Sequence, residues 1–332
     1  MAYTNTHRLP LPIVAWLAND EYDHDDNVVS VTSFIKPLRE IILTSRIKQN
    51  ASLLQRIGDN NQDVMNMLKS RLGTAMHSAI ERTWKSEKLP EILMQIEGMS
   101  KKDVDRLVVN PTEEQLNVKG AIPIYVEHTM YKEHDGFTFR GTADCIFKGT
   151  LMDFKKTSVR SYTDPNKDYK YALQGSMYRW IDPVLITKDY MLIIEVYDDW
   201  TQGKANSPDY PPAPIIVKTI PLKDPAENED YVNDKLDDLE DFDNAKDHKI
   251  PLCTDVELWR KGKEVWKYYS KSSSKRASKV LHSQEEADQY LASKNNVGYV
   301  QRIPDKVRAC KYCDARFICQ QYQQHLINGE IA

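Results

Sequence analysis

The sequence predicts an α/β protein in which helices flank a central mixed β-sheet. Apolar residues recur at helical spacing up to about residue 85, and then at every second position from 121 to 155. A helix at about 168–180 and a buried strand, MLIIEVYDDW, follow. The order helix, strands, helix, strand is typical of a mixed sheet with helices packed on it.

Length and composition indicate a globular protein with a sizeable core. The chain has 332 residues, of which 41% are hydrophobic and 28% charged, so one large domain or two ordinary ones are expected. We divide it into an irregular lead-in (1–29), a core (30–222) and a helical C-terminal region (223–332) that packs back on the core. No apolar run reaches the length of a membrane span, and no signal peptide is evident. Five cysteines do not suggest a disulfide framework, so a cytoplasmic protein without a membrane partner is expected.

Charge is distributed unevenly along the C-terminal region. The net charge of −4 argues against a protein that coats nucleic acid, but not against one that binds it locally. Residues 224–247 are strongly acidic and 260–279 strongly basic. Within the basic part, Lys263 and Lys267 are candidate phosphate contacts, although a solvated loop is an equal alternative. ELWRKGKEVWKYY is predicted as a helix, followed by a strand at 279–281, a helix at 283–294 and a strand at 298–303.

Two helices are predicted before the strands begin. SVTSFIKPLREIILTSRIKQN is expected as one helix with Ser30, Thr32 or Ser33 as its N-cap. After a break at 58–61, a second helix is expected from about 62 to 85. It carries His77 and Glu81 one turn apart. A histidine on a helix is ordinarily a surface or core residue, so this one needs further support.

GTADCIFKGTLMDFK, residues 141–155, predicts a β-hairpin with its turn at Lys148-Gly149. Because side chains alternate along a strand, Asp153 and Lys155 share a face, and Asp144 joins them if its strand is in matching register. One interpretation is an exposed hairpin with an ordinary ion pair. The other is a divalent-metal site in which a lysine orients or activates a water.

The surroundings of the hairpin resemble a known nuclease superfamily. Gly-x-x-Asp followed by Asp-x-Lys resembles the core of the PD-(D/E)XK nucleases. Three further elements resemble their RecB-like branch, which includes phage recombination exonucleases and CRISPR-associated nucleases: GTAMHSAIERTW with His77, IYVEHTMY with Glu127, and YALQGSMYRW with Gln174 and Tyr178. The resemblance covers roughly residues 30–200 and implies a restriction-endonuclease-like core.

The resemblance also implies roles for the site residues. His77, Asp144 and Asp153 would bind Mg²⁺ or Mn²⁺, with the Phe154 carbonyl adding an oxygen, and Lys155 would orient the water that attacks a backbone phosphorus. Glutamates are expected in support: Glu81 to orient the imidazole, and Glu127 either near the metal or simply exposed.

Further residues are assigned to substrate binding on the same basis. Gln174 would position active-site groups or a phosphate, and Tyr178 would lie near the DNA path. Three more side chains are candidate phosphate contacts: Lys156, Lys170 and Arg179.

The function implied is a metal-dependent DNA exonuclease of phage or bacterial recombination, repair or replication, acting in the bacterial or phage-infected cell. DNA is the expected partner, and a recombination or single-strand-binding protein a second candidate. The alternatives are a structure-specific endonuclease and a non-catalytic DNA- or partner-binding protein that retains the fold. The sequence gives no direct sign of an oligomer.

CKYCDARFIC places Cys310, Cys313 and Cys319 at a C-x2-C-x5-C spacing, which is typical of metal binding in a reducing compartment. The spacing resembles the iron–sulfur members of the RecB-like nucleases, such as AddB and the CRISPR-associated family. In those proteins an early cysteine before a proline completes a four-iron cluster. Here Lys36 precedes Pro37.

The fourth ligand of such a site is therefore open. Cys253 or His282 could complete it, whereas Cys145 is expected in the core. Three interpretations remain: an iron–sulfur cluster with an unusual fourth ligand, a zinc site, or reduced thiols packed on the N-terminal helix.

Overall fold

The computed structural model describes residues 3–19, 28–58, 62–96, 98–260, 262 and 264–331. The chain forms two compact units, one from residues 1–36 and 55–236 and the other from 37–54 and 237–332. Residues 37–54 therefore group with the C-terminal region. Residues 20–27, part of the predicted irregular lead-in, lie outside the described residues. Within them, no helix combines the length and apolar character that crossing a membrane requires.

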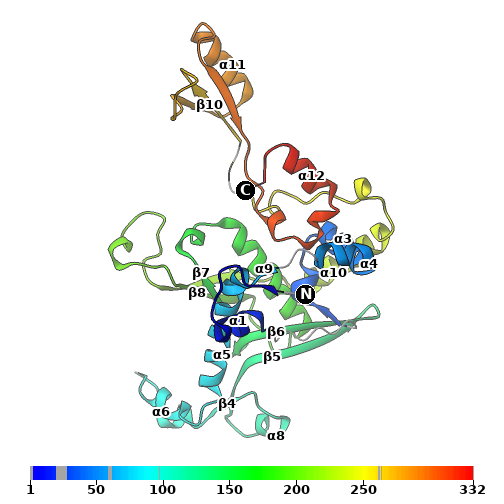
Figure 1. Cartoon of the computed structure of the whole chain (residues 1–332). Coiled ribbons are helices and arrows are strands. Elements are labelled where there is room, and N and C mark those ends of the chain that lie inside the picture. Colours follow the sequence, from blue (N-terminus) through cyan, green and yellow to red (C-terminus); the bar gives the residue numbers. More distant parts are fainter. Residues whose placement is uncertain are drawn as a thin grey trace. The chain divides into compact units, whose positions relative to one another are not determined.

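The first unit is built on a seven-stranded mixed sheet, which confirms the predicted fold class (Figure 1). Its order is β4-β5-β6-β7-β8-β9, with β2 paired to β6. Pairs β4/β5, β7/β8 and β2/β6 are parallel, and the others are antiparallel. The strands are β2 (Val28–Ser30), β4 (Leu107–Val109), β5 (Ile122–His134), β6 (Phe137–Phe147), β7 (Thr150–Thr157), β8 (Tyr190–Tyr197) and β9 (Ile215–Pro221).

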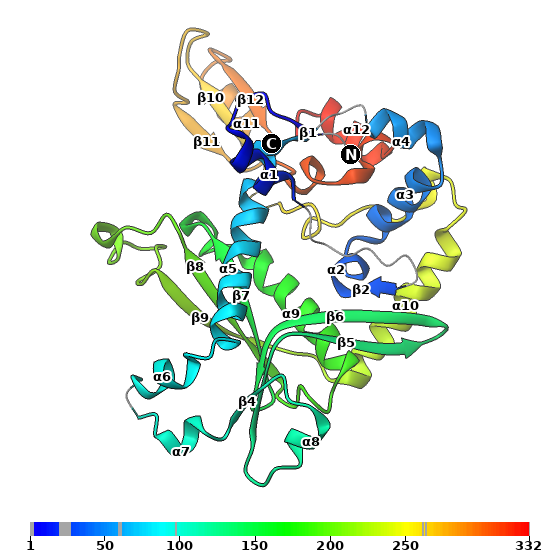
Figure 2. The same ribbon diagram turned by 60° about the horizontal axis from the view of Figure 1, so that its bottom comes forward.

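Helices cover both faces of this sheet (Figure 2). On α5 (Leu68–Trp84), Trp84 packs on one face against the cluster of Ile124, Val126 and Cys145. On α9 (Pro165–Ile181), Gly175 lies against Leu151 and Met191 on the other. Shorter elements complete the unit: β1 (Tyr3–Thr4), α1 (Leu11–Ala18), α2 (Val31–Phe34), β3 (Gln62–Asp63), η1 (Val64–Met67), α6 (Leu89–Met94), α7 (Lys101–Val104), α8 (Glu113–Leu116), η2 (Val159–Ser161), η3 (Gln202–Lys204) and α10 (Pro225–Phe242), whose last turns belong to the second unit.

Three expectations about the early elements are corrected. The lead-in is not wholly irregular, because α1 occupies Leu11–Ala18. The helix expected over residues 30–50 is two helices, α2 and α3 (Leu38–Lys48). Pro37 separates them, since proline lacks a backbone N–H and disfavours helical geometry in the residue before it. The N-cap at Ser30 is confirmed, as its side chain accepts from the Ser33 N–H. The second helix begins at Leu68 rather than near 62.

The predicted hairpin between β6 and β7 is confirmed. Lys148 and Gly149 both have positive φ, 49° and 76°, the backbone of the tight turns that match strand twist. A Cβ on Gly149 would clash with Thr187 Oγ1. The turn therefore needs glycine both for its φ and for its space.

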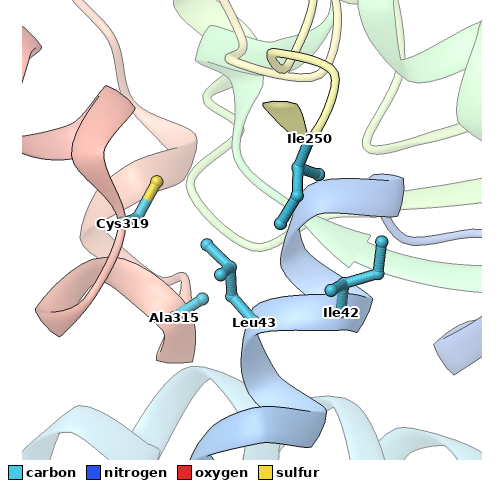
Figure 3. Packing of buried hydrophobic residues seen from close by; sticks show 5 residues of the cluster. All are labelled: Ile42, Leu43, Ile250, Ala315 and Cys319. Atoms are coloured by element: carbon cyan, nitrogen blue, oxygen red, sulfur yellow. The ribbon is translucent and has the colours of Figure 1, made fainter. Parts of the chain in front are cut away.

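The second unit has a small core formed around α3 (Figure 3). Ile42 and Leu43 pack with Ile250, Ala315 and Cys319. Its other short elements are α4 (Ala51–Gly58, which spans the boundary between the units), η4 (Asp247–Lys249), η5 (Ala309–Lys311), η6 (Asp314–Phe317) and α12 (Gln320–Ile327).

The second unit also holds a three-stranded antiparallel sheet of order β11-β10-β12, with strands β10 (Val265–Tyr269), β11 (Lys279–Leu281) and β12 (Tyr299–Ile303). Helix α11 (Gln284–Ser293) packs on it, so the predicted strand–helix–strand order is confirmed. The helix predicted for ELWRKGKEVWKYY is wrong, because Trp266 lies in β10. Four of residues 265–269 are β-branched or aromatic, and the segment is alternately buried, a pattern that favours a strand.

Candidate functional site

The site forms where strands β6 and β7 separate. Their ladder runs from Phe147–Thr150 to Cys145–Met152 and ends there. Beyond it, the Asp144 carboxylate accepts a hydrogen bond from the Phe154 N–H at 2.7 Å. Asp144 is thus fixed by the neighbouring strand at the fork of the sheet. Cys145 is buried in the core, as expected.

Glu127 on β5 lies beside Asp144. The β5–β6 ladder pairs Val126 with Cys145 and His128 with Ala143, but the position between them, Glu127 opposite Asp144, is unpaired. Glu127 has φ of 48°, which a non-glycine residue rarely adopts. Such strain, of order 1–3 kcal/mol, tends to persist at functional sites. Here it interrupts a regular strand next to a second carboxylate.

His77 on α5 joins these two acids. Its Nδ1 lies 3.3 Å from Glu127 Oε1 and 3.4 Å from Asp144 Oδ1, and its Nε2 lies 2.9 Å from the Phe154 carbonyl oxygen. The hydrogen bonds to Asp144 and Glu127 raise the pKa of His77 to about 10. At neutral pH the imidazole is therefore a cation between two carboxylates. A metal ion bound through Nδ1 would have to displace that proton.

The ligand atoms of His77, Glu127 and Asp144 all lie within 4.8 Å of one another, and no other group of three or more such side chains among the described residues is as compact. The structure thus groups Glu127 with His77 and Asp144, two of the residues assigned to metal binding, whereas Asp153, also assigned, is not part of this group. Imidazole and carboxylate oxygens together fit Mn²⁺ well and Mg²⁺ acceptably.

Asp153 and Lys155 form an ion pair next to this group, with Lys155 Nζ 2.7 Å from Asp153 Oδ2. Asp153 is only 1% exposed. Burial raises the pKa of its carboxyl to about 6; Asp144 adds to this rise, whereas Lys155 and His77 oppose it. Lys155 keeps 29% of its side chain exposed. The ammonium is therefore positioned by a buried partner while it remains accessible to a substrate.

Gln174 and Tyr178 contact each other on α9, and Gln174 Nε2 donates to the Tyr178 hydroxyl at 2.9 Å. Tyr178 is 4% exposed. Its ring lies on Gly141 so closely that a Cβ there would be 2.7 Å from it. The tyrosine packs α9 against β6 instead of offering its ring to DNA.

Glu81 lies away from the imidazole it was expected to orient. It pairs with Lys85 at 2.6 Å on the exposed side of α5, whereas the imidazole contacts are made by Glu127 and Asp144. The one-turn spacing of His77 and Glu81 did not identify the partners of the imidazole, because the nearer carboxylates come from the sheet.

The expected phosphate contacts are scattered. Lys156 pairs with Asp198 at 2.5 Å, and Arg179 Nη1 donates to the Lys223 carbonyl. Lys170 is half-buried on α9. Lys267 belongs to β10 of the second unit, and Lys263 lies outside the described residues.

Glu195 on β8 is a residue that the sequence reasoning missed. It is fully buried and in register with Lys155. It accepts hydrogen bonds from Tyr197 at 2.5 Å and Tyr171 at 3.4 Å, and Lys218 Nζ lies 3.3 Å away. Together with burial, its charge raises the pKa of Tyr171, and Asp153 contributes to the same shift. The signal in the sequence was an acid inside an otherwise apolar strand.

Four cysteines line one cavity of about 30 Å³ in the second unit: Cys253, Cys310, Cys313 and Cys319. Gln321 fixes the first of these, accepting from the Cys253 N–H at 2.9 Å and donating to its carbonyl at 3.0 Å. Arg39 Nε donates to Cys319 Sγ at 3.2 Å. His282 lines a different cavity, so it is not the fourth member of this group.

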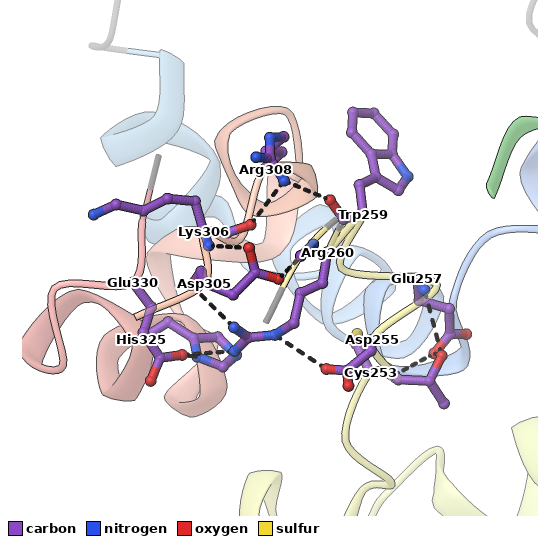
Figure 4. Close-up of polar contacts among 12 residues, drawn as sticks. Cys253, Asp255, Glu257, Trp259, Arg260, Asp305, Lys306, Arg308, His325 and Glu330 are labelled. Atoms are coloured by element: carbon purple, nitrogen blue, oxygen red, sulfur yellow. Dashed lines mark hydrogen bonds and ion pairs between the residues drawn. The ribbon is translucent and has the colours of Figure 1, made fainter. Parts of the chain in front are cut away.

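Two arginines tie the segment after Cys253 to the segment before Cys310 (Figure 4). Arg260 contacts Asp255 at 3.0 Å and Glu330 at 2.6 Å, and it donates to the Asp305 carbonyl. Arg308 donates to the Trp259 carbonyl at 3.1 Å. The loops that carry the cysteines are therefore held by charged hydrogen bonds.

The sulfurs are spaced more widely than one metal ion needs. Within the described part of the chain, no three of them lie within 4.8 Å of one another. Thiolates about 2.3 Å from one Zn²⁺ would be within about 4 Å of each other. Burial raises the pKa of Cys310 to about 11 and of Cys313 to about 12, so without a metal these thiols are neutral.

Comparisons with known proteins add little to this picture. No protein-family model matches the chain, and no curated protein matches it. Similar solved structures include SSO0001, at 14% identity and a TM-score of 0.36, covering 68% of this chain and 80% of that one. An alkaline exonuclease from Laribacter hongkongensis (14%, TM-score 0.25) and a phage-related exonuclease from Haemophilus somnus 129PT (15%, 0.24) each match 39% of this chain. These matches span 62% and 63% of the two exonucleases. Scores of this size do not establish a common fold.

Proposed function

We propose that the protein is a metal-dependent nuclease that hydrolyses phosphodiester bonds in DNA as an exonuclease. The observation that carries this proposal is the compact group of His77, Glu127 and Asp144 at the fork of β6 and β7, with the Asp153–Lys155 pair beside it. We place the activity in recombination, repair or replication of bacterial or phage DNA, on the resemblance of the motifs.

The residues that would hold Mg²⁺ or Mn²⁺ are His77, Glu127 and Asp144, with Asp153 adjoining them. Glu127 is thus a ligand in this proposal and not only a supporting residue. A divalent ion there would polarise a phosphoryl oxygen and lower the pKa of a water. Three carboxylates in one place repel a phosphate, so the site needs a cation before DNA can approach.

Lys155 would act on the substrate directly. Its ammonium is oriented by the buried Asp153 carboxylate and is partly exposed, so it can donate to a water or to a phosphate oxygen. As negative charge grows on the phosphate during attack, a fixed ammonium stabilises it more than mobile water would. Glu195, with Tyr171 and Tyr197, would support β8 behind this lysine.

The test is cleavage of linear DNA with Mg²⁺ or Mn²⁺, with and without chelator. Lys155→Ala and Asp153→Ala should abolish digestion, whereas Glu81→Gln should not, because Glu81 pairs with Lys85 outside the site. Digestion of linear but not of circular DNA distinguishes an exonuclease from a structure-specific endonuclease. Cleavage retained in both site variants would refute the proposed site. A wild-type chain that binds DNA but never cleaves it would favour the non-catalytic alternative.

We further propose that Cys253, Cys310, Cys313 and Cys319 bind a metal centre that stabilises the second unit. Four thiols on one cavity form a complete donor set, and their wide spacing favours an iron–sulfur cluster over zinc. Metal analysis and a visible absorption spectrum of protein purified without oxygen test this. Iron together with visible charge-transfer absorption supports a cluster. Zinc without iron would change the assignment to a zinc site. The absence of both metals would refute the proposal.

A further inference from the structure

The sheet of the second unit has one face packed and one face open. Trp266, Tyr268 and Leu281 are buried with Ala287 of α11 in a single cluster. Side chains alternate along a strand, so the neighbours Lys267 and Tyr269 point to the side opposite α11. The hydrophobic packing of this sheet is therefore on its helix side.

The register defines what stands on the open face. Tyr269 is opposite Tyr299, and Lys267 lies between Gln301 and Val280. The rings of Tyr269 and Tyr299 are stacked, with centroids 5.1 Å apart and planes 13° apart. Tyr299 and Val280 are 38% and 42% exposed. A pair of nearly parallel, accessible rings can be extended by a further planar ring.

The connection between β10 and β11 adds positive charge next to this sheet. Lys271, Lys275 and Arg276 in it are all exposed. Within the described residues, neither these three nor Lys267 forms an ion pair with an acidic side chain. Of the acids next to this sheet, Glu285, Glu286 and Asp288 lie on α11 at the opposite face, and Glu264 pairs with Arg302 at 2.7 Å. The charge is therefore asymmetric across the sheet.

We propose that this face, the Tyr269–Tyr299 stack with Lys267 and the basic β10–β11 connection, binds single-stranded DNA. Aromatic rings bind bases only where base faces are accessible, which excludes an intact duplex, and unpaired lysines bind the phosphates between the bases. The choice of DNA over RNA rests on the proposed nuclease function. The binding itself does not require cleavage.

The test measures binding of the full chain to fluorescent oligo(dT), and to a duplex of equal length, in EDTA so that no digestion occurs. Tyr269→Ala with Tyr299→Ala should weaken oligo(dT) binding at least about five-fold, the low end of what one base–aromatic stack contributes. Duplex binding should change little. Tyr269→Phe with Tyr299→Phe keeps the rings and should bind like the wild type.

The cations are tested by salt dependence. Lys267→Gln, Lys271→Gln and Lys275→Gln together should reduce the slope of log affinity against log salt by about 0.7 for each phosphate that the variant no longer neutralises.

Three outcomes would overturn the proposal. The first is unchanged oligo(dT) binding in the alanine pair, the second is an equal loss for oligo(dT) and duplex, and the third is tighter binding of oligo(U) than of oligo(dT). Because these experiments measure binding and not cleavage, refuting the nuclease proposal would not refute single-strand binding. Refuting single-strand binding would likewise leave the nuclease proposal standing. Circular dichroism confirms folding of each variant.

Discussion

The two proposed metal-binding regions relieve charge repulsion between their ligands in different ways. At the fork of β6 and β7, the carboxylates of Glu127 and Asp144 are held together by a protonated His77. Around the thiol cavity, burial raises the pKa values of Cys253, Cys310 and Cys313, so these three thiols are neutral. A proton thus takes the place of a cation in the first region, whereas in the second the three buried thiols carry no charge of their own. The first should exchange its cation readily, whereas the second should gain most of its stability from a metal.

The largest expected effect concerns the carboxylate that organises the fork. Asp144→Asn removes a metal-binding charge and the strongest contribution to the raised pKa of His77. We expect the rate of metal-dependent DNA cleavage to fall at least about 10²-fold, and the His77 pKa, followed by NMR, to move toward its ordinary value. Asp198→Asn, which affects only the exposed pair with Lys156, is the matched control. Cleavage by Asp144→Asn at the wild-type rate would show that the fork is not the metal-dependent active site.

The second prediction concerns the thiol cavity. If a metal centre is present, Cys253→Ser should lower the metal content and the free energy of unfolding by several kcal/mol, because metal binding and folding are coupled. Cys145→Ser is the control, since Cys145 is buried on β6 far from the other cysteines in sequence and belongs to a different cluster. Unfolding in denaturant, with metal quantified on the same samples, provides the measurement. A loss equal in both variants would show that the four cysteines are only packed thiols.

How much of this could be foreseen depends on the range of the interactions. The hairpin, its Lys148-Gly149 turn and the pairing of Asp153 with Lys155 follow from alternation over a few residues, and the sequence predicts them. In ELWRKGKEVWKYY, Trp259 and Trp266 are seven residues apart, which is two helical turns and favoured a helix. The alternation within 265–269 was the stronger signal.

Long-range contacts were not predictable from local patterns, and the contact of His77 with Asp144 was expected only from the resemblance of the motifs. The hydrogen bonds between Gln321 and Cys253 join residues 68 apart in sequence, so they depend on how the intervening loops fold. The closeness of Glu127 to Asp144 depends on an unpaired, left-handed position inside a strand, which no local pattern indicates. Glu195 was hidden because its partners come from α9, β8 and β9.

The third prediction is a pH dependence of metal binding at the fork. His77 has a pKa of about 10, above its ordinary 6.5, so its protonation stabilises the fold below about pH 6.5, and this contribution is lost as pH rises toward 10. A metal ion must displace the same proton. Affinity for Mn²⁺, measured by calorimetry, should therefore rise up to about ten-fold per pH unit between pH 7 and 9. His77→Asn should bind more weakly and lose most of this slope. A wild-type affinity independent of pH would show that the imidazole is not a ligand.

The smallest expected effect separates the contribution of Asp153 to stability from its contribution to DNA cleavage. Asp153 is buried, and its folded pKa of about 6 exceeds the ordinary 3.8, so ionising it costs stability as pH rises from about 4 to 6. With chelator present, Asp153→Asn should therefore raise the free energy of unfolding at pH 7.5 by about 1–3 kcal/mol, because the pKa shift already includes the opposing pair with Lys155. At pH 4 the wild-type carboxyl is largely protonated, and the two proteins should unfold alike.

A variant that is less stable at pH 7.5 would mean that the pair with Lys155 outweighs the cost of burial. Greater stability combined with lost cleavage would instead show that this carboxylate is retained for its chemistry, in contrast to the cysteines of the second unit, whose removal should cost stability.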